Sequence, residues 1–86
     1  MATLSVGKIV QYVLSEEDAK QINQRRLEGV GHGNQASVGD VVPAIVVLPY
    51  NDKASTLNGQ AFLDGNDVLW ITSVPYDATS TPGTWH

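Results

Sequence analysis

The side chains best suited to bind an anion lie in the stretch SEEDAKQINQRRLEG, which contains Asn23, Arg25 and Arg26. On a helical wheel Ala19, Ile22 and Arg26 share one face, and Asn23 lies beside them. A guanidinium donates two parallel hydrogen bonds to a phosphate or carboxylate, so Arg26, with Arg25, is predicted to point into a cleft and bind an anion. The alternative is structural: Arg26 lays its stem on a sheet with its head group in water, and Asn23 bonds a loop carbonyl.

Turn residues and aromatic rings complete the candidate ligand site. Asp64 and Asn66 belong to the turn DGND, where such side chains also satisfy turn amides. Trp70 falls in a strand and is expected to be core or half-core. Trp85 either folds back over its own core or packs on another copy, where its ring would help to stack a ligand. The predicted ligand-binding residues are Asn23, Arg25, Arg26, Asp64, Asn66, Trp70 and Trp85.

Catalysis and metal binding are not indicated by the residues. The two histidines are His32, in a Gly-rich loop, and His86, the last residue, so neither lies on a rigid element that could hold a catalytic base. The DGND turn does not match the calcium-loop pattern, and GVGHGN lacks the Lys-Ser/Thr pair of a phosphate-binding loop. We therefore expect a protein that is not an enzyme and that uses no metal and no cofactor.

Composition limits the partners that the chain can have. The net charge is −4, and only five Lys and Arg residues are present among 86 residues. A protein that binds nucleic acid broadly carries a basic face, so such binding is not expected. No apolar run approaches the ~20 residues that span a bilayer, and no signal peptide is recognisable, so no membrane partner is expected. The absence of Cys fits a reducing compartment.

One helix and about four strands are predicted along the chain. Ser15 is a good N-cap with Asp18 completing a capping box, and Gly29 supplies the stop, which predicts a helix over residues 16–28. Alternating or continuous apolar residues predict strands over 5–14 and 40–51 and a β-hairpin over 60–74. Residues 29–39 form a Gly-rich loop, and 75–86 form an extended C-terminal tail.

This order of elements predicts an α+β fold. We expect a small, mostly antiparallel, half-open β-barrel or sheet of about four strands, with one helix after the first strand. Residues 1–74 would form the single β-rich domain. The edges of such a sheet need to be covered, and self-association is a common way to cover them, so a homo-oligomer is expected.

Four segments carry a resemblance to a known group of proteins. The segments VGKIVQYVLSEEDAKQINQRR, GN, QAFLDGNDVLWITSV and PGTWH resemble small proteins encoded by tailed bacteriophages and prophages. The resemblance covers most of the chain, except the loop after the helix and residues 51–58. It implies a phage origin and carries no mechanism. The expected location is the host bacterial cytoplasm, or the virion if the chain is a particle component.

Two functions fit a phage protein with these residues. The first is an accessory protein that antagonises host defence by sequestering a small nucleotide-type signal at an oligomer interface, which needs an anion grip and stacking aromatics and no catalytic group. The second is a virion accessory protein, such as a decoration or head–tail joining component, with the loop and tail as docking arms. A weaker third reading is an inhibitor whose acidic surface mimics nucleic acid, for which a net charge of −4 is modest.

Overall fold

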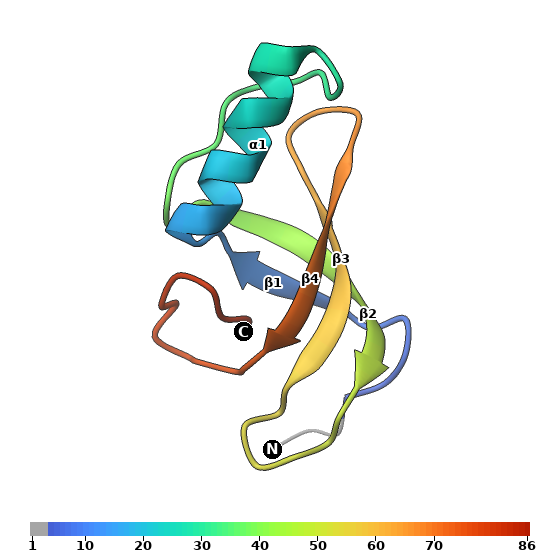
Figure 1. Cartoon of the computed structure of the whole chain (residues 1–86). Helices are drawn as coiled ribbons and strands as arrows, with labels where there is room; N and C mark the ends of the chain where they lie inside the picture. The colour runs from blue at the N-terminus through green and yellow to red at the C-terminus, as the bar shows by residue number, and fades with distance from the viewer. Residues whose placement is uncertain (1–3) are drawn as a thin grey trace.

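The computed structural model describes residues 4–86, so residues 1–3 of the predicted domain lie outside the description. The chain forms a four-stranded antiparallel sheet in the order β1-β2-β3-β4, with one helix after the first strand (Figure 1). This is the predicted small α+β fold with an unclosed sheet. The elements are β1 (Ile9–Val13), α1 (Glu16–Glu28), β2 (Val41–Pro49), β3 (Leu57–Phe62) and β4 (Val68–Val74).

The ends of α1 are those that the sequence predicts. The Ser15 hydroxyl accepts a hydrogen bond from the Asp18 amide at 3.1 Å, and the Asp18 carboxylate accepts one from the Ser15 amide at 3.0 Å, which completes a capping box. Gly29 ends the helix in the left-handed conformation, with φ of 74°. The same Asp18 carboxylate accepts a hydrogen bond from the Tyr12 hydroxyl, which connects the helix to β1. Burial is the main reason that the pKa of Tyr12 is raised, and the Asp18 carboxylate raises it further.

Strand β1 is shorter than predicted because the chain turns before it. The predicted strand over 5–14 begins only at Ile9, and Val6 is exposed. Gly7 has φ of 90°, a conformation that glycine adopts without steric cost, and its amide donates to the Val46 carbonyl at 2.7 Å. The turn at Gly7 therefore lies against β2 and delays the start of β1 to Ile9.

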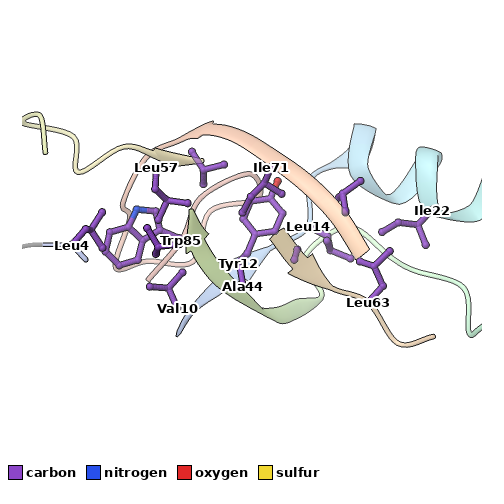
Figure 2. Close-up of a cluster of buried hydrophobic side chains, with 14 residues drawn as sticks. Leu4, Val10, Tyr12, Leu14, Ile22, Ala44, Leu57, Leu63, Ile71 and Trp85 are labelled. Carbon is purple, nitrogen blue, oxygen red and sulfur yellow. The ribbon is translucent and has the colours of Figure 1, made fainter. Parts of the chain in front are cut away.

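The core fills the inner face of the curved sheet and extends along it. Val10 and Tyr12 from β1, Ala44 from β2 and Ile71 from β4 point inward, and Ile22 of α1 closes one end of the cluster. Figure 2 shows Trp85 at the opposite end. Side chains at alternate strand positions face the other way, which leaves a second, outer face of the sheet.

The C-terminal tail packs against its own chain. The amides of Gln11 and Val13 donate to the carbonyls of His86 and Thr84, each at 2.9 Å, so residues 83–86 cover the free edge of β1. On its other side the Trp85 amide donates to the Pro75 carbonyl at 3.0 Å. Of the two arrangements considered for Trp85, the structure shows the one in which the tail folds over its own core.

The Trp85 side chain is a core residue. It is 6% exposed, and its indole donates to the Ser55 carbonyl at 2.8 Å. The ring of Tyr76 meets it edge-on at 4.9 Å between centroids. Within the part of the chain that the structure describes, no helix is long and apolar enough to cross a membrane.

Candidate functional site

The predicted polar residues meet where the C-terminal end of α1 approaches the β3–β4 turn (Figure 1). Arg26 is at the centre of this contact. Its Nη1 and Nη2 donate to the two carboxylate oxygens of Asp67 at 2.9 and 3.1 Å, and its Nε donates to the Asn34 carbonyl at 3.0 Å. Only 7% of the side chain is exposed. All three guanidinium nitrogens of Arg26 therefore donate to other residues of the protein, and the side chain joins α1 to the loop after it and to the β3–β4 turn.

Arg25 has a different environment from its neighbour. Its Nη1 donates to Asp67 at 3.1 Å and to the Val68 carbonyl at 2.8 Å, and 30% of its side chain is exposed. Its Nε and Nη2 make no hydrogen bond to any residue in 4–86. Of the two arginines, Arg25 is thus the one whose donors are available to an external anion.

Asp67 is the residue of this cluster that the predicted site omits. The hydrogen bonds from Arg26, opposed by burial and supported by Arg25, lower the pKa of Asp67. Two guanidinium charges and one carboxylate leave the cluster with a local charge of one positive unit. The sequence signal was weak, because Asp67 is simply one of two acids in the DGND turn until the fold brings that turn to α1.

Three predicted site residues hold backbone or neighbouring side chains in place. Asn23 donates to the Ala36 carbonyl at 2.9 Å and accepts from the Ala36 amide at 2.8 Å, which is the structural alternative considered for it. Asp64 accepts from the side chain of Asn34 at 2.8 Å. Asn66 accepts from the backbone amide of His32 at 3.0 Å. The Asn23 contacts hold the loop against α1, and those of Asp64 and Asn66 hold it against the hairpin.

Glycine allows that loop to touch the hairpin directly. A Cβ on Gly65 would lie 2.4 Å from the His32 carbonyl oxygen, and a Cβ on Gly33 would lie 2.3 Å from the carbonyl oxygen of Asp64. Both distances are too short for a side chain. The backbones pair here, since the amide of Asn34 donates to the Asp64 carbonyl at 2.9 Å. The Gly-rich loop is therefore built for close approach of two backbones.

The enclosed space beside Arg26 is too small for a ligand. A cavity of about 70 Å³ lies between α1, the loop that follows it and the β3–β4 turn, and is lined in part by Ile22, Arg26, Asn34, Leu63 and Asp64. Ligand pockets are typically ~300–1,000 Å³, whereas one water takes up about 30 Å³ of the liquid. The cavity suits a small number of waters. A larger ligand would have to bind on the surface, where Arg25 lies.

The two tryptophans of the predicted site lie in different places. Trp70 is on the outer face of β4 and is 66% exposed, contrary to the expected core or half-core position. It is two residues from Val68 in β4 and points to the same side of the strand, and Arg25 contacts the backbone carbonyl of Val68. Trp85 is buried at the far end of the core (Figure 2). The structure therefore does not bring Trp85 to the arginine cluster, because the tail uses the ring to fill its own core.

The group that this cluster leaves available for chemistry is the partly exposed guanidinium of Arg25, a type of group that binds anions. In residues 4–86 no group of three or more His, Cys, Asp or Glu side chains is placed to hold a metal ion. Comparison with known proteins gave no matching family model, no matching curated protein and no matching solved structure.

Proposed function

We propose that the chain is a non-enzymatic phage accessory protein that sequesters a small nucleotide-type signal. The phage setting rests on the sequence resemblance. The observation that supports the ligand class is the pairing of Arg25, which keeps free guanidinium donors, with the exposed ring of Trp70 farther along β4. A phosphate would bind the free side of the guanidinium, and a base would stack on the indole.

In this proposal the two arginines have different roles, one structural and one in ligand binding. Arg26 holds Asp67 and the loop, and Arg25, anchored by one nitrogen, presents the other two to the ligand. Sequestration requires affinity and no bond breaking, and a cation and an aromatic ring can supply that affinity. The two guanidinium groups exceed the Asp67 carboxylate by one positive charge, which favours a phosphate at this place although the net charge of the chain is −4.

The test is thermal unfolding with a panel of linear and cyclic nucleotides. A nucleotide present at 100 times its Kd stabilises the folded protein by ~2.7 kcal/mol, which raises the Tm by roughly 11–22 °C. We expect Arg25→Gln to lose this shift. The matched control is Lys20→Gln, which removes one positive charge from an exposed position of α1 and should keep it.

Trp70 supplies a second readout, since Trp85 is buried. Nucleotide stacking should quench Trp70 fluorescence in the wild type, and native mass spectrometry of gently purified protein should show a few hundred daltons of bound mass. No shift with any nucleotide, or equal shifts for Arg25→Gln and Lys20→Gln, would reject nucleotide capture at this site.

A virion accessory protein is the second candidate, favoured by a different observation. The outer face of the sheet is exposed, apolar and free of charged residues, as expected of a surface that binds other protein subunits. Such a component would copurify with phage particles on a density gradient, and its unfolding would not respond to nucleotides.

A further inference from the structure

The outer face of the sheet carries an unusual number of exposed apolar side chains. Alternation places one residue in two on this face in every strand, and the inner face already forms the core. Six large apolar side chains of the face are between 42% and 67% exposed: Ile9, Val41, Val47, Phe62, Val68 and Trp70. Monomeric proteins rarely leave contiguous apolar patches of more than a few hundred Å² uncovered.

The lack of charged side chains on the outer face indicates which kind of partner can cover it. The outward-facing strand residues include no Asp, Glu, Lys or Arg, although the chain has fourteen such residues. A nucleic acid or an anionic membrane needs cations to bind it. A second copy of the chain presents the same uncharged face, so two chains of net charge −4 would meet where their repulsion is smallest.

The size of the face suits a dimer. The exposed parts of the six apolar residues amount to on the order of 500 Å². Glutamine, proline and threonine side chains between them add further area. A standard interface takes ~800 Å² from each partner. The face therefore approaches what a stable dimer requires.

The register of the sheet indicates how two copies fit. Ile9 pairs with Ile45, Ile45 with Gln60, and Gln60 with Trp70, so these four residues form one row across the face. At the β1 end of the row, a shallow hollow of about 580 Å³ is lined in part by Ile9, Val41 and Pro43. The large Trp70 ring is at the other end.

We propose that the outer face binds a second copy of this chain, with Trp70 of each copy seated in the hollow beside Ile9 of its partner. A two-fold axis parallel to the strands, passing between β2 and β3, exchanges β1 with β4 and produces both contacts at once. Gln60 then lies near the axis. The packing is that of two sheets face to face, ~10 Å apart.

This dimer would complete the ligand site described above, and only that consequence rests on the proposed function. A base stacked on Trp70 of a single copy has one face in water. In the dimer one face of the Trp70 ring packs in the partner's hollow, so a base stacks on the other face of the ring, and the partner's surface beside it keeps water from the base. The association itself requires no ligand.

The test is the mass of the ligand-free protein, measured by sedimentation over a range of concentrations. We expect the wild type to be a dimer of 9.2 kDa chains. Gln60→Glu is nearly isosteric and places two like charges at the centre of the interface, which should raise the dimer Kd at least about 100-fold. Gln21→Glu makes the same change on the exposed side of α1 and should leave the Kd unchanged.

Fluorescence quenching by acrylamide provides an independent readout of the proposed geometry. Trp70 should be shielded in the wild type and become accessible in Gln60→Glu, while the buried Trp85 contributes the same in both. A one-chain mass for the wild type, or equal Kd values for the two variants, would overturn the proposal. A dimer that binds no nucleotide would reject the proposed function and leave this interface standing. Nucleotide binding by a monomeric protein would do the reverse.

Discussion

Two adjacent arginines in this chain have separate roles because a helix points neighbouring side chains in different directions. Arg26 faces the loop and the hairpin, where it makes three hydrogen bonds and is almost fully covered. Arg25 reaches the edge of β4 with one nitrogen and remains partly in solvent. The sequence makes Arg26 the main candidate for binding an anion. Its contacts instead show the structural role, which leaves Arg25 as the candidate.

The stability of two matched variants tests this division. Arg26→Met keeps the aliphatic stem but leaves Asp67 and the Asn34 carbonyl short of donors, so we expect a loss of at least about 2 kcal/mol in the free energy of unfolding. Arg25→Met removes a more exposed pair and should cost about 1 kcal/mol or less. Urea denaturation measures both. Equal losses in the free energy of unfolding would show that the two arginines stabilise the fold to the same extent.

Asp67 makes stability depend on acid pH. Hydrogen bonds from Arg26 hold its pKa below the ordinary value of about 4. A carboxyl whose pKa is lowered on folding stabilises the protein above its unfolded pKa, and this stabilisation is lost as the pH falls through the folded pKa. We therefore expect the wild type to be more stable than Asp67→Asn by a constant amount above pH about 5.

That difference should shrink steadily below pH about 4. The comparison isolates Asp67, because Asp77, whose pKa is lowered to about 2 by its bonds from Thr79 and Thr81, is present in both proteins. Urea titrations at a series of pH values supply the measurement. A difference that stays constant down to pH 2 would mean that the arginines do not favour the charged form of Asp67.

At the scale of elements, local chemistry explains what could be predicted. The capping box and Gly29 mark both ends of α1 in the sequence, and DGND marks the hairpin turn, because caps and turns depend on residues a few positions apart. The start of β1 was misplaced, since Gly7 turns the chain within an otherwise strand-like pattern.

The site was harder to predict because its contacts join distant segments. Arg26 and Asp67 are 41 residues apart, and the predicted set contained the arginine without its carboxylate. The set also joined Trp85 to Trp70 on the basis of residue type alone. Only the tertiary fold shows that one ring fills the core and that the other lies in solvent.

For the molecule as a whole, the chain end is a structural part of the sheet. Residues 83–86 cover β1 on one side and contact the segment after β4 on the other, and the Trp85 ring fixes them to the core. Chain termini normally fray because nothing holds them. Here fraying would expose a buried indole and leave the edge of β1 unpaired, so we expect residues 83–86 and β1 to unfold together with the centre of the sheet.

Amide hydrogen exchange tests this cooperativity. The amides of Gln11 and Val13 are bonded to the carbonyls of the tail, so they exchange only when the tail leaves β1. They should exchange about as slowly as the amide of Ala61 in the central strand β3. In Trp85→Leu, which keeps an apolar side chain but loses the indole hydrogen bond to Ser55, both should exchange much faster relative to Ala61. If they already exchange a hundredfold faster than Ala61 in the wild type, the tail opens independently of the core.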